Sequence, residues 1–178
     1  SWTGGGAVVL SSGAGLTFSG TGNGNIFAGR TLTIDAGATA TVSGAIELDP
    51  GTNVINNAGT LNLTGTAIRH ANGSQGSLTL TNTGTINKTG AGTFIVGSSP
   101  APEHVALTNN GTINVNAGTL FYAGGTGTSN GTVNLLAGST WQTNGATMNF
   151  ASGSTLSGTG TLLTSFGTTN VLMPVHTF

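Results

Sequence analysis

The sequence contains no cysteine and very few ionisable residues: three Lys and Arg, four Asp and Glu and three His among 178 residues. Without cysteine, neither disulfides nor thiolate metal sites contribute to the fold. The three cations, Arg30, Arg69 and Lys88, are scattered, which excludes the clustered basic patch that nucleic acid or anionic lipid requires. A formal net charge of −1 also leaves little Coulomb repulsion between copies, so self-association is physically easy.

Long apolar runs and helical patterns are lacking too. No stretch approaches the roughly 18 apolar residues that a membrane-spanning helix needs, so we expect no membrane insertion. No long apolar stripe recurs with a period of about 3.6 residues, which leaves little room for helix. No Pro-rich or charged linker divides the chain, and we expect one domain over residues 1–178.

What the chain has in abundance is glycine, with 32 residues, between short runs rich in Thr, Val and Ile. β-Branched residues favour strands. In Thr112-Ile113-Asn114-Val115 the apolar residues alternate with polar ones, so a strand there would turn one face to a core and the other to solvent. The composition therefore predicts an ordered, all-β protein.

A short phrase recurs along the chain with small changes. It occurs as Ala58-Gly-Thr-Leu-Asn-Leu63, Thr83-Gly-Thr-Ile-Asn-Lys88, Asn110-Gly-Thr-Ile-Asn-Val115 and Asn130-Gly-Thr-Val-Asn-Leu135. The sequence numbers of its glycines, Gly59, Gly84, Gly111 and Gly131, increase by uneven steps of 25, 27 and 20. A second phrase begins at Gly92, Gly118 and Gly138, so each repeat holds at least two strands. A turn and a short strand repeated in this way predict a solenoid.

We therefore predict an all-β parallel β-solenoid of roughly eight coils of about 20–27 residues each. Residues 1–57 form less regular coils, residues 58–163 the clear repeats, and residues 164–178 a tail that caps the last coil or docks on a neighbouring subunit. A bare solenoid end exposes unpaired backbone groups, which must be capped or joined to another molecule. The candidate assembly residues in the tail are Val171, Leu172, Met173, Val175 and Phe178.

The repeats resemble those of large bacterial surface proteins. The resemblance is carried by Leu107-Thr-Asn-Asn-Gly-Thr-Ile-Asn-Val-Asn-Ala-Gly-Thr-Leu120, Ser129-Asn-Gly-Thr-Val-Asn-Leu-Leu-Ala-Gly-Ser-Thr140 and Ser157-Gly-Thr-Gly-Thr-Leu162. These segments are similar to the repeats of autotransporter passengers and filamentous-haemagglutinin-like adhesins. The resemblance implies a right-handed parallel β-helix, export, and an extracellular or cell-surface location in bacteria. It carries no active-site signature, and it leaves open whether the chain is a whole subunit or a segment of a longer protein.

The function we expect is structural and non-enzymatic, without a cofactor or a bound metal. The chain would be a subunit that stacks on itself into filaments, or an adhesin segment that contacts a host or matrix surface. The candidate recognition loop is formed by Pro100, Pro102, Glu103 and His104, and a loop there would also explain the long step from Gly84 to Gly111.

Two binding functions are alternatives. Thr31-x-Thr33, Thr39-x-Thr41 and Thr79-x-Thr81 could present rows of hydroxyl and methyl groups to ice. The uneven repeat weighs against this, because its unequal steps are expected to put equivalent threonines out of register. Alternatively, carbohydrate could stack on Trp2, Tyr122 and Trp141, although aromatic residues in a repeat register are more often core.

A polysaccharide lyase or hydrolase is a less favoured alternative. Glu47 and Asp49 alternate on one strand, and Asp35 is expected one short coil earlier, so three carboxylates could cluster. Asp49 also begins a turn sequence, however, and the carboxylates could simply pair with Arg30 and Arg69. The histidines, His70, His104 and His176, have no partners at metal-ligand spacing. The Asn-Gly pairs at 72, 110, 130 and 144 are expected to supply left-handed turn conformations.

Overall fold

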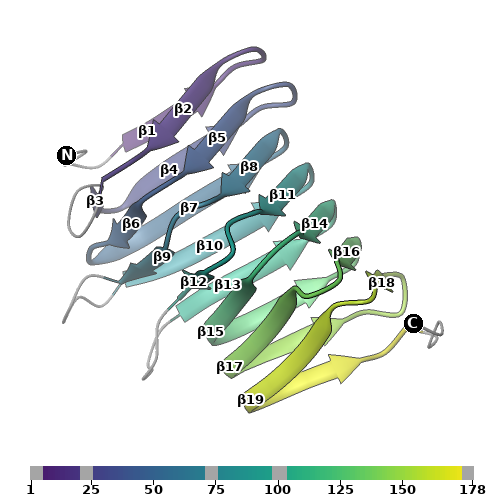
Figure 1. Ribbon diagram of the computed structural model, residues 1–178. Coiled ribbons are helices and arrows are strands. Elements are labelled where there is room, and N and C mark those ends of the chain that lie inside the picture. The colour runs from purple at the N-terminus through teal and green to yellow at the C-terminus, as the bar shows by residue number, and fades with distance from the viewer. Residues whose placement is uncertain (1–5, 21–25, 71–75, 98–103, 174–178) are drawn as a thin grey trace.

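The computed structural model describes residues 6–20, 26–70, 76–97 and 104–173, and within them it contains strands and turns but no helix (Figure 1). The strands are β1 (Gly6–Leu10), β2 (Gly15–Phe18), β3 (Ile26–Phe27), β4 (Arg30–Ile34), β5 (Thr39–Val42), β6 (Ala45–Leu48), β7 (Gly51–Asn57), β8 (Thr60–Leu63), β9 (Ala67–His70), β10 (Gly76–Asn82), β11 (Thr85–Lys88), β12 (Thr93–Val96), β13 (His104–Asn109), β14 (Thr112–Val115), β15 (Thr119–Ser129), β16 (Thr132–Leu135), β17 (Thr140–Phe150), β18 (Thr155–Gly158) and β19 (Thr161–Val171).

These strands stack as a parallel β-solenoid, as predicted. One sheet has seven strands in the order β18-β16-β14-β11-β8-β5-β2, and each coil contributes one of them. The other sheet has twelve strands and covers two further faces, so a coil has three strand segments. From β2 to β18 the chain makes six turns, which is fewer than the expected eight, because residues at both ends of the chain lie outside this span.

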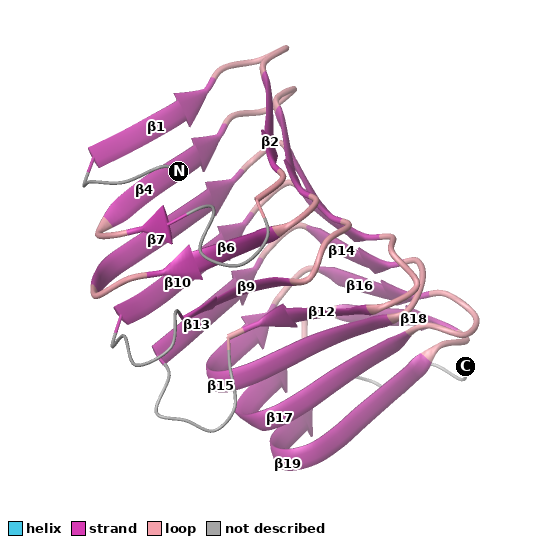
Figure 2. Ribbon diagram, turned by 60° about the vertical axis from the view of Figure 1, so that its left-hand side comes forward, coloured by secondary structure: helices cyan, strands magenta, loops and turns pink. Residues whose placement is uncertain are grey.

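The two faces of the twelve-stranded sheet are joined by the long strands β15, β17 and β19, which bend through a corner of the coil (Figure 2). The first half of β15 pairs with β12 and its second half with β13. Tyr122 and Gly125 on β15 are the register partners of Val96 and Val105. In sequence, residues 123–124 of one coil therefore correspond to residues 97–104 of the preceding coil, and most of the additional residues of the step from Gly84 to Gly111 fall between Val96 and Val105.

The core is a continuous column of inward-facing apolar side chains. Leu61, Ile86, Ile113 and Val133 follow one another on the seven-stranded sheet and are all buried. Near the C-terminal coils the column is filled by aromatic rings; Tyr122 and Trp141 have centroids 6.5 Å apart, and Trp141 packs edge-on against Phe150 at 6.1 Å.

The burial of these rings bears on the alternative in which carbohydrate stacks on exposed aromatic residues. Tyr122 and Trp141 are fully buried, and the Tyr122 hydroxyl donates to the carbonyl of Val105 at 2.8 Å. Burial raises the pKa of the Tyr122 hydroxyl above its ordinary value. Neither ring can stack on a sugar, so these two residues belong to the core and do not form the platforms of the carbohydrate-binding alternative. Trp2 lies outside the described residues.

The glycines of the recurring phrase are needed because the coils approach too closely for a side chain. A Cβ on Gly111 would lie 2.2 Å from the carbonyl oxygen of Gly84, and one on Gly131 would lie 2.1 Å from that of Gly111. Neither residue has a positive φ, so the expectation of a left-handed conformation is wrong at these two Asn-Gly pairs. It is correct at Gly145, whose φ is 60°. The pair at Asn72 lies outside the described residues.

A ladder of asparagine side chains runs inside the solenoid at one corner. The Asn57 amide donates to the Asn82 carbonyl oxygen at 2.7 Å, Asn82 donates to Asn109 at 2.7 Å, and Asn109 donates to the Ser129 hydroxyl at 3.0 Å. All four residues are buried. Because buried amides are costly unless they are bonded, this ladder fixes the register of four successive coils.

Candidate functional site

An ordered array of like side chains lies on the outer surface of the seven-stranded sheet. One row consists of the threonines Thr39, Thr60, Thr85, Thr112, Thr132 and Thr155. The second row, two residues further along each strand, consists of Thr41, Asn62, Asn87, Asn114, Asn134 and Ser157. We call these two rows together the Thr/Asn face. Figure 1 shows its strands side by side along one side of the solenoid.

The register of this face contradicts the expectation from the uneven repeat. Thr85 pairs directly with Thr112 across the longest step of the repeat, and Thr112 pairs directly with Thr132 across the shortest. The threonines stay in line because the additional residues of the longer coil fall, in sequence, mainly between Val96 and Val105, and these two valines belong to the other, twelve-stranded sheet. The prediction that uneven steps scramble the row is therefore wrong.

The asparagines of the second row are held in place by one another. The Asn87 amide donates to the Asn62 carbonyl oxygen at 3.1 Å, Asn114 donates to Asn87 at 2.9 Å, and Asn134 donates to Asn114 at 2.8 Å. The Ser157 hydroxyl continues the chain by donating to Asn134. These bonds fix the side-chain rotamers before any ligand arrives, which removes part of the entropy cost of binding.

The Thr/Asn face has no ionisable and no aromatic residue in either of its rows. What it can offer a ligand is neutral: hydroxyl and amide groups that donate and accept hydrogen bonds, together with the methyl groups of threonine. Of the three threonine pairs that sequence reasoning proposed, one, Thr39 and Thr41, lies on this face, whereas the pairs on β4 and β10 lie on the twelve-stranded sheet. Most of the strands that continue the rows are expected from sequence, but their alignment into rows is not. The signal was present in the recurring Gly-Thr phrase, which begins most of those strands.

One ionisable side chain enters the core beneath this face. Lys88 occupies an inward position on β11 between Leu63 and Val115 in the register, and it is buried. Its ammonium donates to the carbonyl oxygen of Gly90 and, at 2.9 Å, to that of Ala117. Burial lowers the pKa of Lys88 from its ordinary value, because the charged form loses its hydration.

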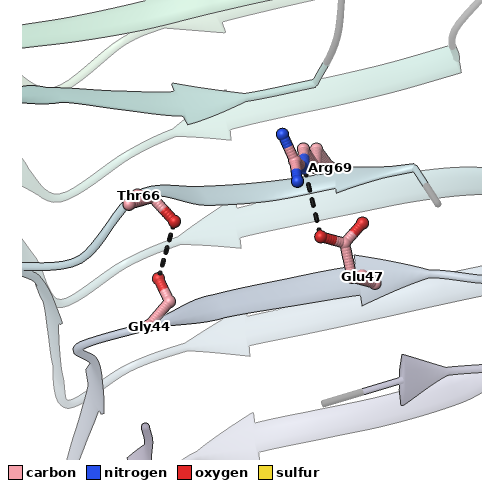
Figure 3. Close-up of polar contacts among 4 residues, drawn as sticks. All are labelled: Gly44, Glu47, Thr66 and Arg69. Atoms are coloured by element: carbon pink, nitrogen blue, oxygen red, sulfur yellow. Dashed lines mark hydrogen bonds and ion pairs between the residues drawn. The ribbon is translucent and has the colours of Figure 1, made fainter. Parts of the chain in front are cut away.

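The carboxylates proposed for catalysis do not form one cluster. Asp35 follows β4, whereas Glu47 lies on β6 of the same coil and not one coil later, so the expected placement is wrong. Glu47 is buried and accepts a hydrogen bond from Nε of the half-exposed Arg69 at 3.1 Å, as Figure 3 shows. In the same view the Thr66 hydroxyl donates to the carbonyl of Gly44 at 3.2 Å, which ties these two coils together.

The expected pairing of Arg69 with a carboxylate is confirmed. Over the described ranges, no three His, Asp or Glu side chains come close enough together to hold a metal ion. Of the histidines, His176 lies outside those ranges.

The assembly residues lie at the C-terminal end of the solenoid, where the structure describes three of them. Val171 ends β19 with 44% of its surface exposed, and Leu172 follows with 65% exposed. Met173 is buried instead, with its sulfur 3.7 Å from the Ser154 hydroxyl. Val175 and Phe178 lie outside the described residues. Sequence reasoning missed Phe166, the most exposed apolar residue of β19 at 74%, because its segment is expected to form a tail and not a strand.

The recognition residues fall largely outside what the structure describes. Pro100, Pro102 and Glu103 are outside the described residues, and His104 is the first residue of β13. In sequence they fall between β12 and β13, the stretch in which this coil has its additional residues.

No family model, no curated protein and no solved structure matches this chain. The described residues include no helix long and apolar enough to cross a membrane. Function must therefore be argued from the surfaces themselves.

Proposed function

We propose that this chain is a non-enzymatic structural protein of the bacterial cell surface or extracellular matrix, a β-solenoid unit that stacks head to tail on further copies of itself. The observation that carries the proposal is the open edge of β19. This strand has 11 residues and pairs with β17, and β17 is its one strand neighbour among the described residues. Over the part of the chain that the structure describes, no strand pairs with its other edge, and the unpaired backbone N–H and C=O groups of such an edge favour the addition of another strand.

The side chains of β19 support the same interface. Val171 is the register partner of Phe150, and Leu162 is the partner of Trp141. Phe150 and Trp141 are fully buried, whereas Val171 is exposed and Leu162 only partly buried. The difference arises because β17 is covered by β19 of the next coil, whereas no described strand covers β19. A further coil placed on β19 would bury this apolar surface and pair its backbone.

The opposite end offers a matching surface. Val8 and Leu16 occupy inward positions in the first coil and are only partly buried, whereas their register partners Leu32 and Ala40 are buried. A first coil on a last coil is a heterologous contact, and such contacts extend into filaments when the rotation does not close. A net charge of −1 opposes this assembly very little.

A segment of an adhesin is the second form of this proposal. It is favoured by the additional residues between Val96 and Val105, since variable contacts are commonly placed in such insertions on a rigid scaffold. The resemblance of the repeats to bacterial surface proteins supports both forms and supports a location outside the cell.

Electron microscopy and sedimentation of the purified 178-residue chain over a range of concentrations test the proposal. We expect fibres whose length grows with concentration. Val171→Asp and Leu172→Lys should shorten or abolish them, because each variant places a charge in the apolar contact.

The matched control is Val54→Lys, which introduces a charge on an outward position of β7 in the middle of the solenoid. This variant should assemble like the wild type. Uniform short rods at every concentration would refute the filament form and leave the adhesin form. Assembly that persists in both tail variants would refute the role of β19.

A further inference from the structure

The Thr/Asn face presents an ordered array along the side of the solenoid, whereas the proposed stacking depends on its two ends. Its first row has six threonines on six successive strands without interruption. The neighbouring face of the twelve-stranded sheet has two outward rows, and neither consists of threonine alone: Val54 and Ala106 interrupt one, and Asn56 and Asn149 interrupt the other. The Thr/Asn face therefore differs from this neighbouring surface in its unbroken row of six threonines.

We propose that the Thr/Asn face binds the surface of ice. This function goes beyond the proposed stacking and is independent of it, because it uses the side of a single solenoid. The ligand is a neutral, tetrahedral lattice of water molecules, which both donates and accepts hydrogen bonds at regular spacings. A row of identical hydroxyl groups is complementary to such a lattice, since each hydroxyl also donates and accepts.

The spacing along the rows is close to that of the lattice. Parallel strands place equivalent residues about 4.8 Å apart. Tetrahedral water with O···O distances of about 2.75 Å has second-neighbour oxygens about 4.5 Å apart. The mismatch is about 0.3 Å per coil, so six threonines centred on the lattice deviate by about 0.8 Å at each end, which is less than the radius of a water molecule.

The spacing across the rows is also compatible. Residues two apart on a parallel strand lie about 6.6 Å apart. The same tetrahedral lattice repeats at about 7.3 Å in the perpendicular direction. Because the face has only two rows, this mismatch of about 0.7 Å does not accumulate.

The order of the side chains adds to the match in spacing. Asn62, Asn87, Asn114 and Asn134 are held by a continuous series of amide hydrogen bonds, so water bound to them would have fixed partners. Threonine is restricted at χ1 because it is β-branched, which keeps the hydroxyl and methyl groups of the first row in a uniform orientation. Ordered hydroxyl groups can anchor water while the methyl groups between them favour a cage of ordered water.

A crystalline polysaccharide is the principal competing ligand, and the chemistry of the face argues against it. Sugar rings are bound most effectively by exposed aromatic rings, and the two rows contain none. Tyr122 and Trp141 are directed into the core instead. The rows also carry no charge, which argues against acidic or sulfated polymers.

The test is the partition of the chain between ice and liquid while an ice crystal grows slowly, together with the thermal hysteresis of the same sample. We expect the wild type to be incorporated into the ice and to give measurable hysteresis. The double variant Thr85→Lys/Thr112→Lys should lower incorporation about tenfold, since it removes contacts from the centre of the surface. The matched control is Thr126→Lys/Thr147→Lys, which alters two directly paired outward threonines of the other sheet and should leave incorporation unchanged.

Each variant is first checked by circular dichroism and thermal unfolding. If the double lysine variant does not fold, Thr112→Val and Thr112→Ser serve in its place, because they remove the hydroxyl and the methyl group in turn with little change in volume. A loss of incorporation in the face variants that the control does not share supports the proposal. Wild-type protein excluded from ice, equal losses in face and control variants, or binding to microcrystalline cellulose without incorporation into ice would overturn it. Fibre formation is scored separately, so failure of either proposal leaves the other standing.

Discussion

The stacked glycines provide the most direct test of how the coils are held together, and Gly111→Ala is the perturbation. Its Cβ would lie 2.2 Å from the Gly84 carbonyl oxygen and 2.7 Å from the carbonyl carbon of Thr83. An ordinary contact would require these coils to separate by about 1 Å. Both clashing groups are backbone atoms of the neighbouring turn, so no flexible side chain can yield.

The cost follows from the hydrogen bonds that cross this turn. The amides of Asn110 and Gly111 donate to the carbonyl oxygen of Asn82 at 2.7 and 3.0 Å, and the amide of Thr112 donates to that of Gly84 at 2.9 Å. A displacement of about 1 Å takes all three beyond hydrogen-bonding distance. At about 1 kcal/mol each the loss is about 3 kcal/mol, less about 0.5 kcal/mol recovered because alanine restricts the unfolded chain. For a chain of this size, that corresponds to a fall in Tm of about 5–10 °C.

Two other glycines separate the steric effect from the conformational one. Gly92 has open space within 4 Å of an added Cβ and no positive φ, so Gly92→Ala should be neutral or slightly stabilising. Gly138 has equal space but a φ of 76°, so Gly138→Ala should cost about 1 kcal/mol through backbone strain alone. Urea unfolding followed by circular dichroism measures all three. If Gly111→Ala unfolds at the same urea concentration as Gly92→Ala, the close approach of the coils is not what requires glycine.

The interior and the corner of the solenoid provide three more tests. Asn82→Ala should lower the free energy of unfolding by about 2–4 kcal/mol, because it breaks the buried asparagine ladder on both sides. Asn130→Ala, which removes an exposed amide pair, should lower it by less than about 0.5 kcal/mol. Equal losses of the two variants in urea unfolding would contradict this. Lys88→Met should stabilise the chain by about 1 kcal/mol at pH 7. Because the folded-state pKa of Lys88 is lowered, the free energy of unfolding of the wild type should rise as the pH is raised toward the ordinary pKa of 10.5, while that of the variant stays constant. If the urea midpoints of the two proteins change in parallel from pH 7 to 10, the burial of a charged Lys88 is not what limits the stability. In the third test, residues 97–104 are replaced by Ala-Gly, the two residues that join Tyr122 to Gly125 in the next coil. The shortened chain should keep its circular dichroism spectrum and its unfolding temperature within a few degrees. An unfolded product would show that residues 97–104 support the coil.

The strands of the recurring phrase can be predicted from sequence because their alternation is local. The pattern predicts strands over residues 60–63 and 112–115, and these form β8 and β14 with the same bounds. Each has two apolar residues that must face inward, and this alone determines which side chains reach solvent. No long-range information is needed to place the threonine and asparagine of each strand on the outer face.

The long strands and the buried lysine cannot be predicted in this way. Gly124, Gly125 and Gly127 resemble a turn in sequence, yet they lie within β15. A Cβ at Gly125 would lie 2.0 Å from the Val105 carbonyl oxygen, so this glycine is required by a neighbouring coil that sequence alone does not identify. Lys88 carries a charge that ordinarily favours the surface, whereas the alternation of β11 directs it into the core, where turn carbonyls receive its ammonium.

The Thr/Asn face shows why an uneven repeat in sequence need not give an uneven surface. In a solenoid, the spacing of a face is determined by hydrogen bonds between coils, so residues added at a distant corner change the sequence step without changing the rise. The stacked glycines strengthen this effect, because Gly84, Gly111 and Gly131 each immediately precede a threonine of the first row and pack on the turn before them. The glycine determines where the strand begins, and the threonine that follows is thereby placed at a fixed height on the face. The Gly-Thr phrase, and not the length of the repeat, is therefore the feature to align when an ordered outer face is sought in such a chain.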